Sequence, residues 1–289
     1  PPAGPGARMI PATTPPKEAA LTPSNYDYLC RLVYQSSGIV LDSTKEYLLQ
    51  ARLLPIARSQ TLRDLNALCD ALRAAPASPL EREIVNAMTT NETFWFRDPA
   101  LWSALRSSLL PALFDRRRPY QSLRCWSAAS STGQEAYSLA ITLNELNLSG
   151  WSFEIIGTDI SSRVVEQARA GLYHPVEVNR GLPAPMLVKY FQRQGLHWQI
   201  ADALRAMARF HQFDLRTPMV LAGPFDLVLC RNILIYFDLD TKRRILDHIG
   251  RALAPGGYLL LGATENLLGV DSRFRSSTIG GILAYQFSP

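Results

Sequence analysis

Small polar residues and a carboxylate follow a short apolar run at residues 123–128, where the chain reads LRCWSA and then ASSTGQEAYS. Serine, threonine and glycine fill residues 130–133, and Glu135 opens the amphipathic stretch that comes next. A strand that leads through small residues into a helix N-terminus is where α/β proteins bind nucleotide-like ligands. The loop lacks the G-x-G-x-x-G pattern of a dinucleotide site, so a bound pyrophosphate is not indicated.

Later apolar runs also end in polar residues. Asp159 ends the second run and Asp214 ends the third. Arg231 and Asn232 end the fourth. In a parallel sheet the ligand lies beyond the carboxyl ends of the strands, so these side chains are expected beside Glu135. Because a carboxylate after the second strand commonly accepts hydrogen bonds from ribose hydroxyls, Asp159 is the predicted adenosine anchor.

Glu135 narrows the class of ligand, because a carboxylate repels a phosphate but attracts an ammonium group. S-adenosylmethionine has a ribose and an ammonium group and has no phosphate. Such a ligand fits Asp159, Glu135 and a loop without the dinucleotide pattern. The predicted cofactor is therefore S-adenosylmethionine, with S-adenosylhomocysteine as its product, and no metal is expected.

Purely structural explanations remain open for the same residues. Residues 132–135 have the pattern of a capping box, in which Thr132 caps the helix and Glu135 reaches back to a backbone N–H. Asp159 and Asp214 each fit the N-cap of a following helix. Their occurrence at successive strand ends favours ligand binding, but spacing alone does not decide between the two explanations.

Length, composition and charge limit the number of domains and the class of partner. The 289 residues, of which 47% are hydrophobic, suffice for one large or two modest domains with a substantial core. The net charge of +5 is spread along the chain, which favours an acidic protein partner over nucleic acid. The compact arginine cluster at residues 116–118 is interpreted as a solvated linker.

The spacing of the cysteines and the length of the apolar runs indicate the cellular location. The four cysteines are widely separated and lack histidines at metal-binding spacing, which predicts reduced and mostly buried thiols. No apolar stretch approaches the roughly 20 residues that span a bilayer, and no signal-peptide pattern opens the sequence. We therefore expect a cytoplasmic protein without membrane insertion.

The chain divides into regions of different pattern. Residues 1–20 are rich in proline, alanine and glycine and are expected to form a flexible tail. Apolar residues at helical spacing over 21–90 predict a small all-α N-terminal domain, and residues 91–118 are interpreted as a linker. From 119 to 289, apolar strands alternate with helices, which predicts a mostly parallel sheet covered on both faces.

The elements expected in this α/β region follow from its apolar runs. Strands are expected at 123–127, 154–160, 209–214, 225–231, 258–263 and 282–287. Helices are expected at 135–146, 162–170 and 241–253. Residues 173–208 do not fit a single crossover, because they contain three prolines and a short hairpin predicted around Gly195. They are interpreted as a small inserted β subdomain.

Five segments together carry a family resemblance. The segments TTNETFWFRD at 89–98, WSAASSTGQEAYS, GTDIS, FDLVLCRNILIYF and GATENL resemble, in order and spacing, the bacterial chemotaxis receptor methyltransferases of the CheR type. The resemblance covers the chain from about Tyr26 onward. It implies an all-α domain followed by a Rossmann-like, S-adenosylmethionine-dependent methyltransferase domain that esterifies glutamate side chains on the cytoplasmic helices of chemoreceptors.

The resemblance also implies roles for individual residues. The linker at 91–118 contributes to the cofactor site, and the family's cofactor-contacting positions are matched here by Asn91, Thr93, Arg97, Glu135, Asp159, Asp214, Leu215, Arg231 and Asn232. Asp214 departs from the family's pattern, which has an asparagine near the adenine. Tyr236 falls where the family places a tyrosine beside the transferred methyl group, so Arg97 and Tyr236 are the catalytic candidates.

Methylation of a carboxylate explains why the candidate site contains no catalytic histidine or cysteine. A glutamate side chain, with a pKa of about 4.3, is already ionised at neutral pH, so no general base is required. Catalysis then comes from alignment of the reacting atoms in a site that excludes water. Arg97 could hold the incoming carboxylate, and Tyr236 could orient the nucleophile. Alternatively, Arg97 and Asp98 form a local ion pair, and Tyr236 merely covers the sheet.

Two further features concern partners. Arg52 and Arg58 lie about two turns apart on a predicted helix, in a region that the family uses to grip acidic receptor helices. Leu54 and Pro55 replace basic residues of some relatives, and a plain solvated face is the alternative. Some family members also bind a receptor pentapeptide through a glycine-bearing loop, but the turn at 191–198 has one glycine, so no pentapeptide binding is expected. A monomer is expected.

Two other functions compete with receptor methylation. The first is a carboxyl methyltransferase of the same fold with another substrate, which the helical domain disfavours because a small substrate needs no such platform. The second is a non-enzymatic signalling scaffold that senses S-adenosylmethionine. The presence of Arg97, Glu135, Asp159, Asn232 and Tyr236 disfavours this scaffold.

Overall fold

A bundle of four helices forms the N-terminal part of the protein in a computed structural model that describes residues 19–219 and 223–288. Residues 1–18 of the expected tail lie outside the described residues. The helices are α1 (Pro23–Ser37), α2 (Glu46–Ser59), α3 (Leu65–Ala74) and α4 (Pro79–Met88). Side chains of Thr22, Asp64 and Ser78 cap three of these helices by accepting a hydrogen bond from a backbone N–H in the first turn. Gly38, at φ 77°, ends α1 in the left-handed conformation.

Most of the segment interpreted as a linker is helical. It forms α5 (Pro99–Ala104), the π-helical turn η2 (Leu105–Leu109) and α6 (Leu110–Arg117). Pro111, which has no N–H to donate, lies in the first turn of α6, directly after the π-helical turn. Residues 90–98 are without helix or strand and connect α4 to α5.

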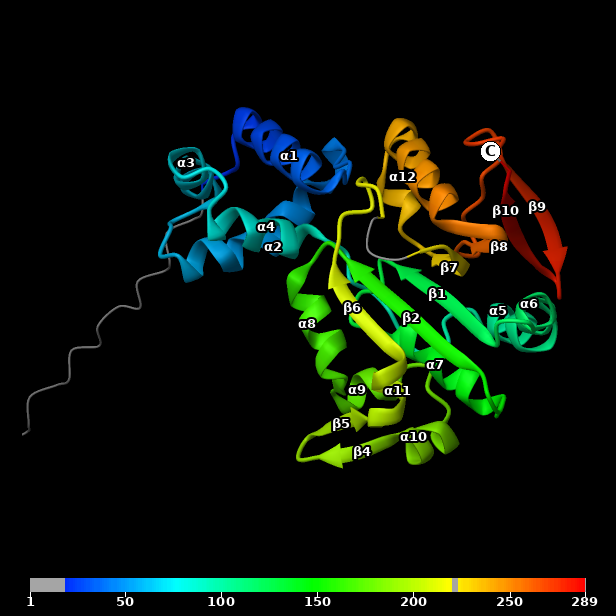
Figure 1. Cartoon of the computed structure of the whole chain (residues 1–289). Coiled ribbons are helices and arrows are strands. Elements are labelled where there is room, and N and C mark those ends of the chain that lie inside the picture. Colours follow the sequence, from blue (N-terminus) through cyan, green and yellow to red (C-terminus); the bar gives the residue numbers. More distant parts are fainter. Residues whose placement is uncertain (1–18, 220–222, 289) are drawn as a thin grey trace, which may run out of the picture.

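A seven-stranded mixed sheet forms the centre of the molecule (Figure 1), in the order β6-β2-β1-β7-β8-β10-β9. The first five strands in this order pair in parallel, and β10 and β9 are antiparallel. Their bounds are β1 (Ser122–Ala128), β2 (Ser152–Asp159), β6 (Ala208–Gln212), β7 (Phe225–Cys230), β8 (Leu253–Leu260), β9 (Phe274–Ile279) and β10 (Ile282–Phe287). The expected α/β class with a mostly parallel sheet is confirmed.

Two strands differ from expectation. β8 begins at Leu253 rather than near 258, because the Pro255-Gly256-Gly257 run lies within the strand, where its pairing with β7 is irregular. A Cβ on Gly257 would lie 2.8 Å from the carbonyl oxygen of Phe225, so this run is a close backbone approach rather than a turn. β9 was not expected, because its four central residues are exposed and its sequence gives no apolar pattern.

Helices cover both faces of the sheet, as Figure 1 shows for α7 (Gln134–Glu145), α8 (Ser162–Ala170) and α12 (Leu239–Ala252). Adjacent strand residues point to opposite faces, so Cys125 and Trp126 belong to different hydrophobic clusters. One cluster packs the sheet against η2, α6 and α7. The other packs it against α12 and the helical bundle.

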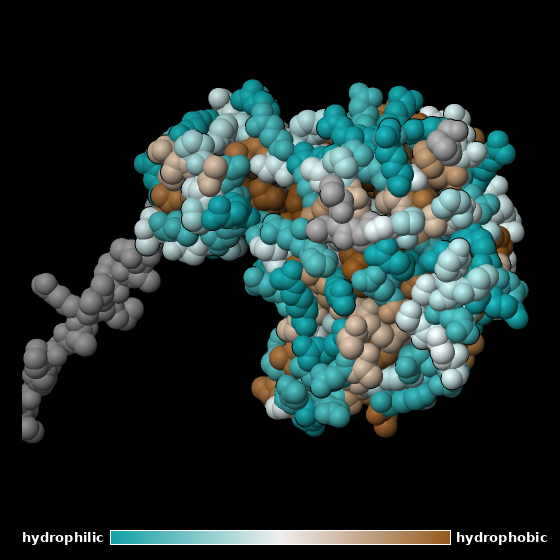
Figure 2. Space-filling model, viewed as in Figure 1, coloured by the Kyte–Doolittle hydropathy of each residue, from teal (hydrophilic) through white to brown (hydrophobic). Residues whose placement is uncertain are grey.

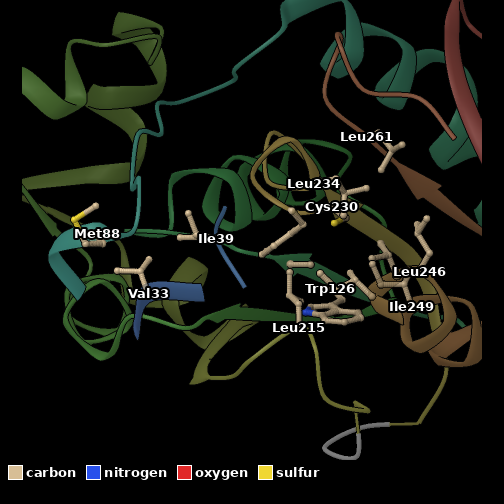
Figure 3. Packing of buried hydrophobic residues seen from close by; sticks show 14 of the residues in the cluster. Val33, Ile39, Met88, Trp126, Leu215, Cys230, Leu234, Leu246, Ile249 and Leu261 are labelled. Atoms are coloured by element: carbon tan, nitrogen blue, oxygen red, sulfur yellow. The ribbon is translucent and has the colours of Figure 1, made fainter. Parts of the chain in front are cut away.

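The second cluster joins the helical bundle to the sheet without interruption. In Figure 3, Ile39 lies between Val33 and Met88 of the bundle on one side and Trp126 and Leu215 of the sheet region on the other. Figure 2 shows hydrophobic residues gathered in the recess between the bundle and the rest of the molecule. The two parts therefore share one hydrophobic core rather than folding around separate ones.

The inserted region carries the predicted hairpin. Its three-stranded sheet has the order β3-β5-β4, and β4 and β5 join at Gly195. The elements are β3 (Leu172–Tyr173), α9 (Pro175–Val178), α10 (Ala184–Tyr190), β4 (Phe191–Gln194), β5 (His197–Ile200) and α11 (Asp202–Met207). Gly195 has φ 58° and open space around its Cβ position, as a tight turn permits.

The cysteines are free thiols, and Cys69, Cys125 and Cys230 are buried. Burial raises the pKa of Cys69 to about 11 and also raises the pKa of the other three. Within residues 19–219 and 223–288, three or more His, Cys, Asp or Glu side chains nowhere gather as metal ligands would. The same residues contain no helix whose length and apolar character suit a membrane span.

Candidate active site

A pocket lies at the carboxyl ends of β1, β2, β6 and β7, bordered on one side by the end of α1 and by residues 89–97. Every site residue predicted from the sequence lines it: Asn91, Thr93, Arg97, Glu135, Asp159, Asp214, Leu215, Arg231, Asn232 and Tyr236. The fold thus brings together residues that are scattered over four strand ends and the connecting segment.

Asp159 is buried at the end of β2 and joins two loops. Its Oδ2 accepts a hydrogen bond from the backbone N–H of Ser131 at 3.0 Å, and its Oδ1 accepts one from Ser161 at 2.9 Å. The N-cap of α8 is Ser161, so the alternative explanation, in which Asp159 caps this helix, does not hold. Burial raises the pKa of Asp159, and the backbone N–H groups oppose this only in part. A carboxylate has about four acceptor positions, so capacity remains for ligand hydroxyls.

Glu135 is held from two directions at the start of α7. Ser127 Oγ donates to its Oε1, and Arg231 Nη1 donates to its Oε2, each at 2.8 Å. The capping box does not form, because the N-cap of α7 is Gly133 and Thr132 donates to Gln134 instead. Glu135 therefore faces the pocket as an oriented carboxylate rather than serving as a helix cap.

Arg231 is a buried cation between two carboxylates. Its side chain is 1% exposed and pairs with Asp98 through Nη2 and with Glu135 through Nη1. The same Nη2 donates to the carbonyl oxygen of Arg97 at 2.9 Å. Asp98 was not expected at the site, since its role depends on a partner distant in the sequence. Its pairing with Arg231 overturns the alternative of a local ion pair between Arg97 and Asp98.

Arg97 presents a half-buried guanidinium group to the pocket. Its Nη1 donates to the carbonyl oxygen of Glu92 at 3.4 Å, and its guanidinium carbon lies 5.4 Å from the ring centroid of Phe94. Among the residues that the structure describes, Arg97 forms no ion pair with a carboxylate. Its charge is therefore available to an anionic group that enters the pocket.

The segment that carries Arg97 is fixed along its length. Ser131 Oγ donates to the carbonyl oxygen of Asn91 at 2.8 Å, and the backbone N–H of Trp95 donates to the carbonyl oxygen of Arg180 at 3.2 Å. The Trp95 ring is fully buried and packs edge-on against Tyr173 and Phe191 of the inserted sheet. The inserted subdomain thus helps to place the pocket wall, which its distance in the sequence does not suggest.

Asn232 adopts φ 58° and is supported by a residue that sequence reasoning passed over. Glu265 Oε2 accepts hydrogen bonds from the backbone N–H groups of Asn232 and Gly262, and its Oε1 accepts one from Leu234. The GATENL segment contained this residue, but its spacing gave no role. Asn232 Oδ1 is buried and has no hydrogen-bond partner within the described parts of the chain. It is an acceptor that a bound ammonium or hydroxyl group would satisfy.

Tyr236 ends the 3₁₀ turn η3 (Leu234–Tyr236) and is half-buried at the pocket. Its carbonyl oxygen accepts a hydrogen bond from the backbone N–H of Val40 at 3.0 Å, which ties it to the chain after α1. Asp214 is followed by a turn rather than a helix, because the N–H of Thr217 donates to its carbonyl oxygen, so the alternative of an N-cap does not hold there either.

Apolar walls complete the pocket. They come from residues that the sequence could not distinguish from ordinary core: Ile39, Phe94, Trp102, Ile160, Phe213, Ile233 and Phe237. Together with Leu215 they offer a surface for a flat ring, whereas Asp159, Glu135 and Asn232 Oδ1 offer acceptors. The positive charge of Arg231 is taken up by carboxylates rather than aimed at a phosphate. This donor and acceptor set fits a nucleoside that carries an ammonium group and no phosphate.

The two basic candidates on α2 differ in their surroundings. Arg52 is half-buried and its Nη1 donates to the carbonyl oxygens of Met88 at 2.9 Å and Thr89 at 3.3 Å. Its Nη2 donates to Thr90 Oγ1 at 3.2 Å. Arg52 therefore anchors the end of α4 and the start of the pocket segment, defined as residues 89–97. Arg58 is exposed near the end of α2.

Comparison with known proteins matches this organisation. Residues 24–89 match the family model described as the CheR methyltransferase all-alpha domain, and residues 91–280 match the CheR methyltransferase SAM binding domain. The chain is 36% identical over 258 residues to the chemotaxis protein methyltransferase Cher2 of Pseudomonas putida, covering 87% of this chain and 94% of the relative. It is 37% identical over 262 residues to chemotaxis protein methyltransferase 1 of Vibrio cholerae, covering 88% and 94%.

Proposed function

The chain belongs to the CheR methyltransferase family, and from that premise we propose that it methylates glutamate side chains on the cytoplasmic helices of bacterial chemoreceptors. S-adenosylmethionine is the cofactor and, when bound, supplies an electrophilic methyl group on its sulfonium sulfur. The observation that carries the proposal is the convergence of all ten predicted site residues on one pocket between the helical bundle and the sheet. The names of the chemotaxis relatives supply the substrate class.

The contacts in the pocket support the following proposed cofactor-binding roles. Asp159 accepts hydrogen bonds from the ribose hydroxyls, and Glu135 with Asn232 Oδ1 receives the ammonium group. Arg231 keeps the Glu135 carboxylate oriented toward the pocket. The remaining assignments, also proposals, place Asn91, Thr93 and Arg97 beside the cofactor and Asp214 and Leu215 beside the adenine.

The catalytic roles fall to Arg97 and Tyr236. The Arg97 guanidinium binds the incoming glutamate carboxylate by charge-assisted hydrogen bonds and fixes the direction of its oxygen. The Tyr236 hydroxyl orients the same oxygen or the methyl group. Because the nucleophile is already ionised, the protein's contribution is alignment and exclusion of water by the apolar walls.

The receptor contact and the state of the enzyme belong to the same proposal. We place the acidic receptor helix against the helical bundle, with Arg58 as the contact residue and Arg52 mainly as an anchor of the pocket segment. The short turn at Gly195 supports methylation without pentapeptide binding. We further propose a cytoplasmic monomer divided into a bundle at 21–90, a linker at 91–118 and a catalytic domain at 119–289.

Methyl transfer to receptor membranes tests this function. The full chain is incubated with radiolabelled S-adenosylmethionine and chemoreceptor-containing membranes, and label that base releases as methanol identifies a carboxyl methyl ester. We expect such label on the receptor band. Turnover confined to small carboxylic acids would point to another substrate. Cofactor binding without turnover on either would point to a non-enzymatic sensor, and both results contradict the proposal.

A further inference from the structure

Arg216 binds a residue of the cofactor pocket. Its Nε lies 3.0 Å from both carboxylate oxygens of Asp214, and its Nη2 lies 2.7 Å from Oδ2. The backbone N–H of Arg216 also donates to Asp214 Oδ1 at 2.9 Å. The side chains are 19% and 26% exposed, so the pair is largely shielded from water. Asp214 thus lines the pocket as a neutralised group with a fixed orientation.

The same guanidinium group caps the end of α1. Its Nη1 donates to the carbonyl oxygens of Tyr34 at 3.2 Å and Gln35 at 2.9 Å, and its Nη2 donates to that of Ser36 at 2.9 Å. The last carbonyl groups of a helix lack intrahelical partners and carry the negative end of its dipole. The last turn of α1 contains no basic residue, so the cation at its C-terminus comes from the catalytic domain.

The chain after α1 is closely fitted to the catalytic domain. Ser37 and Ile39 line the cofactor pocket, and Gly38 lies between them. A Cβ on Gly38 would come within 2.9 Å of Arg216 Cδ and 3.3 Å of the Phe237 ring, in a left-handed conformation that disfavours other residues. The end of α1 therefore rests against Arg216 and Phe237 at the place where it contributes to the pocket wall.

We infer that Arg216 is a positioning residue that couples the cofactor pocket to the helical bundle. It holds Asp214 in the wall near the adenine and holds the end of α1 so that Ser37 and Ile39 close the same wall. Cofactor binding and docking of the bundle then favour each other, since linkage is reciprocal. The inference rests on the proposed function for the identity of the cofactor, and it adds a coupling that the reaction itself does not require.

Product binding and hydrogen exchange test the coupling in the full chain. Affinity for S-adenosylhomocysteine is measured by calorimetry, and exchange is followed in peptides that cover residues 31–40. We expect Arg216→Ala to weaken binding about tenfold, which is within the usual range of coupling between sites, and to raise exchange at 31–40. Arg216→Lys keeps a cation but lacks the planar fork, so binding is intermediate and exchange stays raised. Arg251→Ala, which removes an exposed ion pair with Asp247 on α12, is the matched control.

A double variant separates coupling from charge neutralisation. Arg216→Ala leaves the Asp214 carboxylate unpaired, and adding Asp214→Asn removes that charge. If neutralisation were the whole role, the double variant would regain full affinity, and this result overturns the inference. Unchanged exchange at 31–40 in Arg216→Ala overturns it as well. Because these readouts use product binding, receptor methylation can fail while the coupling stands, and the reverse is equally observable.

Discussion

The buried charge of Arg231 at the pocket is neutralised by ion pairs with individual carboxylates. Arg231, with 1% of its side chain exposed, is offset by Asp98 and Glu135. A buried cation without partners would cost several kcal/mol, so the two carboxylates keep the site stable as well as oriented. Arg97, in contrast, forms no ion pair with a carboxylate within the described chain and lines the pocket. Arg97, the pocket arginine without an ion pair among the described residues, is therefore the residue to which we assign binding of the substrate carboxylate.

That assignment predicts a separation of catalysis from cofactor binding. Arg97→Ala and Tyr236→Phe are expected to lower kcat by roughly 10- to 100-fold, because each removes an interaction worth about 1.5–3 kcal/mol with a charged group. Cofactor affinity, measured by calorimetry, is expected to change much less. Tyr120→Phe, at a position 69% exposed on the surface, is the control. A matching loss of cofactor affinity in Arg97→Ala and Tyr236→Phe would contradict the catalytic assignment.

Asp159 predicts a pH dependence of cofactor affinity. Burial raises its pKa, so the free protein takes up a proton at this carboxylate at a higher pH than an ordinary aspartate, whose pKa is about 3.9. In the proposed role the ionised form accepts hydrogen bonds from the ribose hydroxyls, and affinity is therefore expected to fall as the pH drops toward the raised pKa. Asp159→Asn should weaken binding by roughly 10- to 100-fold at neutral pH and remove this dependence.

Calorimetry at several pH values checks this expectation. Asp115→Asn, which alters an exposed carboxylate paired with Arg118 away from the pocket, should bind as the unmodified protein does. Persistence of the full acid-side loss of affinity in Asp159→Asn would show that another group titrates.

The sequence predicted the polar residues at strand ends because parallel strands deliver them to one edge regardless of detail. It did not predict Asp98 or Glu265, because their value depends on partners that only the folded chain supplies: the guanidinium of Arg231 and the backbone of Asn232. The apolar residues of the pocket wall could not be predicted either, since Ile39 and Phe213 look like ordinary core residues in the sequence.

At the scale of elements, strands with buried residues on both faces were predictable from mostly apolar runs, as with FDLVLC in β7, where Asp226 is the one polar residue. β9 was not, because the sequence FRSSTI at the sheet edge buries little. The irregular start of β8 was hidden by a proline and two glycines that normally indicate a turn. The local sequence pattern did not predict these two strands, because contacts with residues distant in the sequence decide their conformation.

One glycine between elements carries a prediction about the pocket segment. Gly181, at φ 89°, follows α9, and a Cβ there would lie 2.1 Å from the carbonyl oxygen of Trp95. Gly181→Ala should displace residues 91–97 and lower methyl transfer by tenfold or more, since shifts of about 1 Å near a site can cost up to roughly 100-fold. Gly195→Ala also has a positive φ but meets open space, so only about 1–2 kcal/mol of stability should be lost.

Comparison of activity and thermal stability for the two glycine variants separates a displaced segment from general backbone strain. Equal activity of Gly181→Ala and Gly195→Ala, at matched folded fraction, would rule out the displacement.

At the scale of the whole molecule, the shared hydrophobic core predicts one unfolding transition. The cluster that contains Val33 and Ile39 continues through Leu215 to Trp126 (Figure 3), so the bundle cannot melt without exposing the sheet face. All five tryptophans lie outside the bundle, whereas far-ultraviolet circular dichroism reports helices throughout. The two signals are expected to change at the same temperature, and saturating S-adenosylhomocysteine should raise both together. An earlier loss of helical signal would indicate separate unfolding.

The contact between the inserted subdomain and the pocket segment restricts how this protein can be recombined with its relatives. Besides the Trp95 backbone bond, Arg180 pairs with Glu92 and lies 4.7 Å from the centroid of the Phe94 ring. Residues 173–208 therefore cannot be exchanged independently of the rest of the chain. A segment grafted from a relative must also make the contacts that hold residues 91–97 in place. A chimera whose graft supplies arginine and glycine at 180 and 181 should keep its turnover, and one that lacks them should fold yet lose it.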